Sequence, residues 1–322
     1  MRFSFAVVSD THNDYRCKVA QGRWVTSALR TLAKLRPDFV VGLGDLISGG
    51  GDCGGMGHGL WDQAPAQLLE LERVLLKRLP VPFVPVSGNH DLSPAHTGDR
   101  TRPRRVWSEF WESRAHFLLP SIRPFDMSRS FRFTYRGVSF AAVSAYGTTG
   151  LHALELEWLR RNLKPGDVVL RHTNPWGISC LVPGVCGSAI GHQWHPTPGL
   201  LPRLLKKRRI KALFSGHTHA FYEGVCDSIR FVNTGALGER SMEYVRGWDD
   251  SPYRKRKAFT WVDVLHSGEL VVTFYIWEPS RQRFQRFDPS HFPATVHTHP
   301  VFRLGQFEGL TATCVTRRGP TT

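Results

Sequence analysis

Polar residues that can bind metal follow five separate runs of apolar residues in this chain of 322 amino acids. Each apolar run reads as a buried β-strand, and each polar group comes where the strand ends. In an open α/β sheet, side chains at the carboxyl ends of strands surround the ligand-binding crevice. We therefore expect the five groups to converge on one point; they are Asp10 with His12, Asp45, Asn89 to Asp91, His172, and His217 with His219.

The order of the predicted elements indicates the fold class. Strands and helices alternate at first, with strands at 3–8, 39–43, 83–87, 131–134, 138–144, 167–171 and 210–215, and helices at 24–35, 65–79, 104–117, 153–163 and from 197. Strands alone follow at 221–225, 229–233, 258–265 and 270–276. This change from alternation to a β-meander predicts an α/β fold in which two mixed sheets pack together with helices outside.

The chain divides into one large domain and a short extension. Residues 1–279 carry all of the predicted strands and motifs. Residues 280–322 have little periodicity and are rich in Arg, Pro, His and Thr. We expect this extension to be irregular or partly disordered.

Composition excludes several classes of protein. No apolar run approaches the roughly 20 residues that a membrane span requires, so no membrane association is expected. The first residues enter a core strand and the first motif directly, which argues against a secretory signal and for a cytoplasmic location. Six cysteines are too few for a disulfide framework in a chain of this length. We expect free thiols, with Cys180 and Cys186 as a pair that oxidation could join.

The formal net charge of +15 favours anionic partners. A small phosphate ester fits this charge, and so does nucleic acid. The basic clusters at 100–105, 206–211 and 254–257 are scattered along the sequence, and the second ends a predicted helix, where cations suit the helix dipole. A small phosphate-ester substrate is therefore expected, with nucleic acid as the alternative partner. Nothing in the sequence indicates an oligomeric state.

The residue types at the five strand ends suit phosphoryl transfer. Two metal ions about 3.5–4 Å apart can neutralise a phosphate and activate water. Asp10 and His12 are two residues apart, so an extended backbone would point both to one side, and His217 and His219 repeat this spacing. Gly216 leaves room for close backbone approach.

Together these motifs resemble the calcineurin-like metallophosphoesterases over about residues 7–220. The motifs that carry the resemblance are Asp10-x-His12, Gly44-Asp45, Gly88-Asn89-His90-Asp91, a lone His172 after a strand, and Gly216-His217-x-His219. The resemblance implies a four-layer αββα sandwich of two mixed sheets. It also implies hydrolysis of a phosphodiester or phosphomonoester by attack of a metal-bridging hydroxide.

The resemblance further implies a role for each residue. One metal ion would take Asp10, His12 and His219, the other would take Asn89, His172 and His217, and Asp45 would bridge both. His90 would stand near the leaving group as acid or stabiliser, oriented by a carboxylate. Asp91 is the candidate for that carboxylate, and a cap of the next segment is its alternative role. Manganese, iron and zinc all suit such a mixed set of ligands.

Departures from the family pattern concern the substrate. The His12 position and the absence of a tyrosine near Asp45 argue against the purple acid phosphatase branch. The segment His172-Thr173-Asn174-Pro175 has one residue more before the proline than the frequent His-x-Pro form. The glycine-rich stretch 49–59 is interpreted either as a mobile lid or as a surface loop.

Two alternative functions remain open at the level of sequence. A nuclease of the same superfamily would share the motifs and fit the basic charge. A non-catalytic interaction scaffold on the same fold would lose ligands, whereas all the expected ligands and His90 are present here. A metal-dependent phosphoesterase is therefore the leading hypothesis.

Overall fold

The computed structural model describes most of the chain. The described residues are 1–13, 21–49, 64–92, 101–122, 127–144, 153–176, 178–180, 200–238, 244–245, 248, 250–253, 256–297, 302–303, 306–307 and 313–317. The lid or loop expected at 49–59 lies outside them except for Gly49, and so does the expected start of a helix at 197.

The first sheet has six strands in the order β14-β13-β12-β1-β2-β3. Strands β1, β2 and β3 are parallel, whereas β12, β13 and β14 join antiparallel, so the sheet is mixed. The strands are β1 (Phe3–Val8), β2 (Phe39–Leu43), β3 (Phe83–Val86), β12 (Ala258–Val264), β13 (Leu270–Glu278) and β14 (Arg283–Arg286). All residues of β1, β2 and β3 are buried, which explains their continuous apolar sequences.

The second sheet has eight strands in the order β15-β18-β9-β10-β8-β6-β5-β4. Strands β5, β6, β8 and β10 are parallel, and the remaining pairs are antiparallel. The strands are β4 (Phe131–Tyr135), β5 (Val138–Val143), β6 (Val168–Arg171), β8 (Ala212–Ser215), β9 (Phe221–Cys226), β10 (Ile229–Thr234), β15 (Thr295–His297) and β18 (Thr313–Thr316). The turn between β4 and β5 has positive φ at both Arg136 and Gly137, as a tight hairpin requires.

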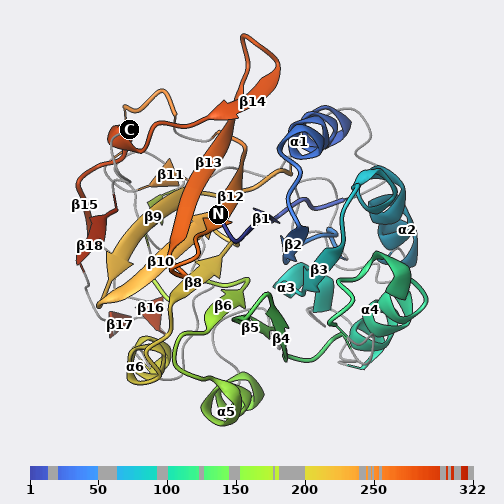
Figure 1. Cartoon of the computed structure of the whole chain (residues 1–322), viewed down its shortest axis with the longest axis horizontal. Coiled ribbons are helices and arrows are strands. Elements are labelled where there is room, and N and C mark those ends of the chain that lie inside the picture. The colour runs from blue at the N-terminus through green and yellow to red at the C-terminus, as the bar shows by residue number, and fades with distance from the viewer. Residues whose placement is uncertain are drawn as a thin grey trace.

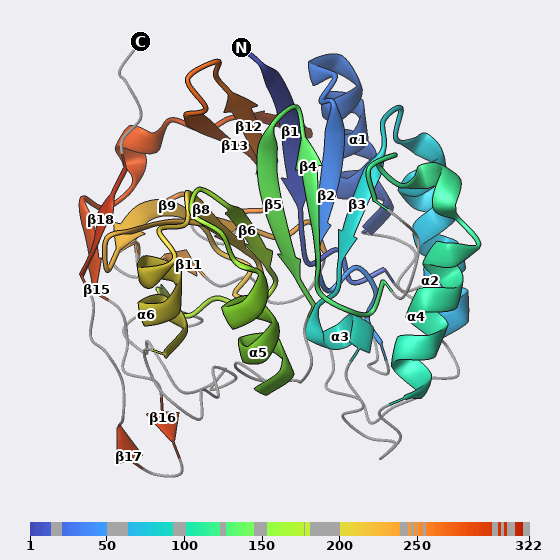
Figure 2. The same cartoon turned by 60° about the horizontal axis from the view of Figure 1, so that its bottom comes forward.

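Helices cover the outer face of each sheet. Helices α1, α2 and α4 lie outside the first sheet, and α5 and α6 lie outside the second (Figures 1 and 2). The helices are α1 (Gln21–Leu35), α2 (Ala64–Val74), α3 (Asn89–Leu92), α4 (Arg102–Glu112), α5 (Ala153–Asn162) and α6 (Leu200–Lys207), with short 3-10 turns at Leu76–Arg78, Ala115–Phe117 and Pro289–His291. The predicted αββα sandwich of two mixed sheets is confirmed.

Aromatic rings from both sheets fill the space between them. Phe5 of the first sheet meets Phe140 and Phe214 of the second edge-on, at centroid distances of 5.5 and 6.0 Å. Phe39 contacts Phe133 and Phe140 in the same way. Each buried phenylalanine contributes about 1.5–3 kcal/mol through removal of its surface from water. This interface fixes the two sheets against each other and therefore fixes the relative position of their edges.

Part of the C-terminal extension belongs to the sheets. Strand β14 continues the first sheet, and β18 pairs with β9 of the second while β15 pairs with β18. These residues form regular strands in place of the irregular course expected for 280–322. A disulfide joins Cys226 at the end of β9 to Cys314 in β18. This bond corrects the expectation of free thiols for these two cysteines; the possible pair of Cys180 and Cys186 lies outside the described side chains.

Four short strands form two small separate ladders. One pairs β7 (Ser179–Cys180) with β11 (Tyr244–Val245), and the other pairs β16 (Phe302–Arg303) with β17 (Gln306–Phe307). Among the described residues, no helix combines the length and hydrophobicity that crossing a membrane demands.

A substitution at Gly42 in β2 tests how tightly the side chains around this strand of the first sheet are packed. A methyl group there would lie 2.3 Å from Cζ of the buried Phe83 ring and 3.0 Å from Cδ1 of Leu46. We expect Gly42→Ala to lower the free energy of unfolding by about 1–3 kcal/mol, because the ring must move in a packed core. Urea denaturation measures this loss.

Phe83→Leu removes the ring atoms that the new methyl group would strike. The double variant Gly42→Ala/Phe83→Leu should therefore lose less than the two single variants together. Strict additivity of the two losses would show that the crowding lies elsewhere.

Candidate metal centre

The fold brings the five polar groups to one edge of the sandwich. Asp10 follows β1, Asp45 follows β2, and Asn89 begins α3 just after β3. In the second sheet His172 follows β6, and His217 lies between β8 and β9. Because β1, β2 and β3 are parallel, and so are β6 and β8, each set of strands ends on one side (Figure 2). The packing of the two sheets places both sets side by side.

The backbone at these positions is left-handed rather than extended. The φ angles are positive at Asp10, His12, Asp45, His217 and His219, with values from 43° to 70°. The expectation that an extended backbone points the paired residues to one side is therefore wrong; successive tight bends do so instead. Such a conformation is unfavourable by roughly 1–2 kcal/mol for a residue with a side chain, and it persists only where surrounding contacts enforce it.

Backbone hydrogen bonds between loops enforce these bends. The Asp10 amide donates to the Gly44 carbonyl at 3.0 Å, and the His12 amide donates to the Asp45 carbonyl at 2.9 Å. From another segment, the Gly238 amide donates to the Asp10 carbonyl at 2.8 Å. The loops after β1 and β2 are thus locked to each other before any side chain is considered.

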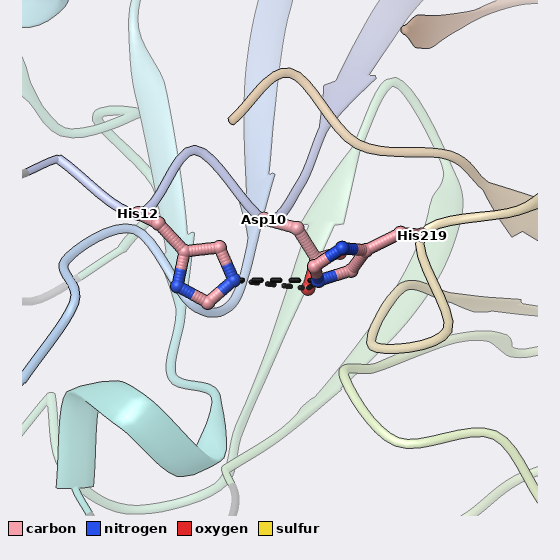
Figure 3. Close-up of side chains that lie close together, drawn as sticks. All are labelled: Asp10, His12 and His219. Carbon is pink, nitrogen blue, oxygen red and sulfur yellow. Dashed lines mark hydrogen bonds and ion pairs between the residues drawn. The ribbon is translucent and has the colours of Figure 1, made fainter. Parts of the chain in front are cut away.

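One group of side chains joins the first and last motifs of the chain. Asp10, His12 and His219 point toward one another from the loops after β1 and β8 (Figure 3). His219 Nε2 lies 3.3 Å from Asp10 Oδ1 and 3.3 Å from His12 Nε2. Their ligand atoms are close enough together to share one metal ion.

A second group contains Asp45, His172 and His217. His172 Nε2 lies 3.1 Å from Asp45 Oδ2. The same oxygen lies 3.9 Å from Nε2 of His12 and 3.9 Å from Nε2 of His90. Asp45 therefore stands between the two groups, where a shared carboxylate would have to be.

Each carboxylate uses its two oxygens differently. Asp10 Oδ2 accepts hydrogen bonds from the Ser9 hydroxyl at 2.6 Å and from the His217 amide at 3.0 Å. Asp45 Oδ1 accepts from the His90 amide at 2.8 Å. The other oxygen of each residue faces the histidines. The protein thus fixes both carboxylates through one oxygen and leaves the second for the centre of the cluster.

His172 is oriented by the strand end of the neighbouring sheet. Its Nδ1 lies 2.8 Å from the Leu43 carbonyl, which can only accept, so Nδ1 carries a proton and Nε2 faces the cluster. Burial alone would lower the pKa of His172, but Asp45 and Asp10 outweigh it and raise the pKa to about 9. Without metal, His172 is therefore a cation at neutral pH, and a metal ion has to displace its proton.

The other ionisable groups respond to the same charges. Burial and then repulsion from His172 lower the pKa of His217 to about 3, which keeps this imidazole neutral as a ligand must be. Burial would raise the pKa values of both carboxyls, but His219 and His172 hold that of Asp10 below its usual value, and His172 and His90 hold that of Asp45 well below it.

Two buried polar atoms of the cluster, Asn89 Oδ1 and His217 Nε2, make no hydrogen bond within the protein. Asp10 Oδ1 and His172 Nε2 face only other members of the cluster, His219 Nε2 at 3.3 Å and Asp45 Oδ2 at 3.1 Å. Buried polar atoms in native proteins nearly always have a partner, so a group of unsatisfied ones at a single point requires an explanation. All of these atoms are oxygen or nitrogen donors suited to divalent transition metals. The residues therefore fit the metal ions that the motifs imply.

Asp91 orients the backbone rather than His90. Its Oδ1 accepts from the amides of Leu46 and Ile47 at 3.0 and 3.1 Å, and its Oδ2 accepts from the Gly88 amide at 2.7 Å. Burial and then the nearby Asp45 raise the pKa of Asp91 to about 7. Asp91 thus holds the loop that carries Asp45, instead of the carboxylate role beside His90 expected from the sequence.

His90 is oriented by a carbonyl group. Its Nδ1 lies 3.0 Å from the Ser48 carbonyl, which accepts the Nδ1 proton and leaves Nε2 toward the cluster. The side chain of His90 is 25% exposed, whereas that of His172 is fully buried. Of these two histidines, only His90 can therefore be reached by a bound ligand.

Close approach explains three glycines of the motifs. A Cβ at Gly216 would lie 2.0 Å from Ser9 Oγ, as the sequence led us to expect. One at Gly88 would lie 2.3 Å from Asp45 Oδ1, and one at Gly44, where φ is +84°, would lie 2.5 Å from His172 Nδ1. Any side chain at these positions would displace a residue of the cluster.

Sequence reasoning missed a buried network beneath the two histidines of the last motif. Asn233 donates through Nδ2 to Thr218 Oγ1 at 2.7 Å and to the Ala220 carbonyl at 2.6 Å, and Ser215 donates to Asn233 Oδ1 at 2.9 Å. Asn174, the additional residue before the proline, donates to Thr218 at 3.5 Å. The available signal was an asparagine within the apolar run 229–234, since a buried amide must find partners.

The raised pKa of His172 predicts a pH dependence for the metal-free protein. The folded pKa of about 9 lies above the ordinary 6.5, so the ion pairs of His172 stabilise the fold fully below pH 6.5. This stability is lost as the pH rises through 9, by on the order of 1–3 kcal/mol. Urea denaturation of chelator-treated protein at pH 6, 7.5 and 9.5 measures the loss.

The variant His172→Gln cannot bind that proton and serves as the control. It should lose less stability than the wild type between pH 7.5 and 9.5, because other titrating groups are common to both proteins. Parallel curves for the two proteins would contradict a protonated His172.

A family model described as calcineurin-like phosphoesterase matches residues 3–221. None of the curated proteins compared with the chain matches it. Among solved structures, GAP50, described as the anchor in the inner membrane complex of Plasmodium, is 13% identical, with a TM-score of 0.50 over 88% of both chains.

A second solved structure comes from a plant. Purple acid phosphatase PPD1 from yellow lupin (Lupinus luteus) seeds is 11% identical, with a TM-score of 0.53 over 88% of this chain and 52% of the lupin chain. At these identities the two structures support the fold alone. The family model spans more than half of the sequence and contains every residue of the cluster. The chain therefore belongs to the calcineurin-like phosphoesterase family.

Proposed function

We propose that this protein is a metal-dependent phosphoric ester hydrolase that acts on a phosphodiester or a phosphomonoester. The observation that carries the proposal is the convergence of unsatisfied oxygen and nitrogen atoms from strand ends of both sheets. A purely structural cluster would not leave buried atoms such as Asn89 Oδ1 and His217 Nε2 without a hydrogen-bond partner. The family match supports the same reaction class.

The residues that would hold two ions follow from two of the three groups of possible ligands in the described residues; the third group combines His12 and Asp45 with His90. Asp10, His12 and His219 would hold one ion, His172 and His217 with Asn89 would hold the other, and Asp45 lies between. Bound ions would supply positive charge to the phosphoryl oxygens and lower the pKa of a bound water. Manganese, iron or zinc would suit these donors.

The protein's own contribution to the reaction would come chiefly from His90. Its ring is fixed through Nδ1 by the Ser48 carbonyl, the side chain is partly exposed, and Nε2 lies 3.9 Å from Asp45 Oδ2. A protonated Nε2 can donate to the departing oxygen of an ester, which prevents unfavourable charge from building up there. The net charge of +15 would attract a small anionic ester to the site.

A non-catalytic anchoring role is the second candidate function. The likeness of the fold to GAP50, which is described as an anchor, favours it. A pure anchor has no need of a reachable His90 beside an unsatisfied cluster. Turnover with metal bound separates the two functions.

Activity of the metal-loaded protein tests the proposal. We expect hydrolysis of bis-p-nitrophenyl phosphate or p-nitrophenyl phosphate that a chelator abolishes and added Mn²⁺ restores. Asp45→Asn should lose both metal and activity, by more than the roughly 10–100-fold typical of losing an outer partner of a metal ligand. Stoichiometric metal without any turnover would favour the anchor, and metal-dependent nicking of plasmid DNA would favour a nuclease.

His90→Ala separates catalysis from metal binding. We expect this variant to keep its metal and to lose about 10²–10⁴-fold in rate, because an acid or stabiliser is removed while the ligands remain. The loss should be larger for phenyl phosphate, a poor leaving group, than for p-nitrophenyl phosphate. Metal analysis and kinetics are measured on the same preparation; an emptied site would make His90 a ligand instead.

A further inference from the structure

The fold joins basic segments that are separate in the sequence. The end of α5 and the end of α6 lie on the same outer side of the second sheet (Figures 1 and 2). The Arg208 guanidinium donates to the Arg160 carbonyl, and the Gly166 amide donates to the Arg209 carbonyl at 3.0 Å. Six exposed cations of these two segments form what we call the basic face: Arg160, Arg161, Lys164, Lys206, Lys207 and Arg209.

Neighbouring negative charge compensates little of this face. Glu157 pairs with Arg161 at 2.5 Å. Asp167 is buried and bound by Arg132, and Glu155 is buried against Arg171, so neither reaches the surface. Two helix C-termini supply only about half a negative charge each. Within the described part of the chain, capping of the helices therefore explains part of this positive charge, and the larger part stays uncompensated.

The basic face lies away from the metal cluster. Helix α5 leads into the start of β6, and α6 leads into the start of β8, whereas His172 and His217 follow the ends of these strands. A four-residue strand spans roughly 13 Å. The face thus occupies the opposite edge of the second sheet, where it cannot serve as part of the ester site.

We propose that the basic face binds the phosphate backbone of a nucleic acid. Half of its cations are arginines, whose planar guanidinium group matches phosphate oxygens in pairs. An anionic membrane would fit less well, because surface-binding helices also insert apolar side chains. In the described parts of α5 and α6, the one exposed large hydrophobic residue is Leu154, in the first turn of α5 at the far end from the face. The proposal goes beyond the hydrolase function and does not depend on it.

Binding of a labelled 20-base-pair DNA duplex to the full chain tests the proposal by fluorescence anisotropy between 50 and 200 mM KCl. Millimolar inorganic phosphate in the buffer competes with DNA for the metal cluster, so that the binding measured reports on the basic face. We expect log affinity to fall linearly with the logarithm of the salt concentration, with a slope of about −0.9 per neutralised phosphate. The double variant Lys206→Glu/Lys207→Glu should make this slope shallower by the amount expected for roughly two phosphate contacts. It should also weaken binding about tenfold or more at 100 mM salt. Its ester hydrolysis should equal that of the wild type, which also confirms folding.

Helix α1 offers a matched control, since Arg30 and Lys34 are exposed and Lys34 also lies in a last helical turn. Arg30→Glu/Lys34→Glu makes the same change in net charge on the other side of the sandwich and should bind DNA within twofold of the wild type. Equal weakening in both variants would mean that only net charge acts and would overturn the proposal. Binding to phosphatidylserine vesicles that requires Lys206 and Lys207, without binding to DNA, would also overturn it.

Discussion

The hydrogen bonds that fix one oxygen of Asp10 and one of Asp45 are the constraint on which the site depends. The Ser9 hydroxyl and the His217 amide hold Asp10, and the His90 amide holds Asp45. The bonds from the His217 and His90 amides tie each carboxylate to a distant loop that itself carries cluster residues. Charged carboxylates are unfavourable in a buried site unless they are bonded in this way. The second oxygen of each can then face the histidines without freedom to turn away.

The loops around the cluster contain features that oppose folding and other features that offset them. Left-handed backbone at five cluster positions and like charges at close range both oppose folding. The backbone hydrogen bonds between the loops, and the hydrogen bonds from the Asp91 carboxylate to amides of the β2 loop, hold the bends in place. When no metal is present, a proton on His172 offsets the repulsion between the carboxylates. Strain stored at a functional site and balanced by the scaffold is a common feature of preorganised binding centres.

The sequence was sufficient for the sandwich and for the residues that meet in the cluster, since apolar runs and strand-end polar residues follow from local rules. It was not sufficient for the course of the chain between them. The left-handed bends at Asp10 and His217 depend on bonds to distant loops, and no local pattern reports such bonds. The role of Asp91 depends on amides of the β2 loop, and the strand at 313–316 forms only because β9 offers it an edge.

The central place of β12 in the first sheet has a consequence for how the chain folds. Phe3 in β1 pairs with Val264 in β12, so one edge of β1 stays open until β12 has been synthesised, long after β2 and β3. Contacts between such distant segments slow folding and leave strand edges exposed meanwhile. A nascent chain halted after the last motif would hold all the cluster residues and still present β1 as an open edge. Synthesis of β12, rather than synthesis of the motifs, therefore marks the point at which the sheet that carries Asp10 and Asp45 can be completed.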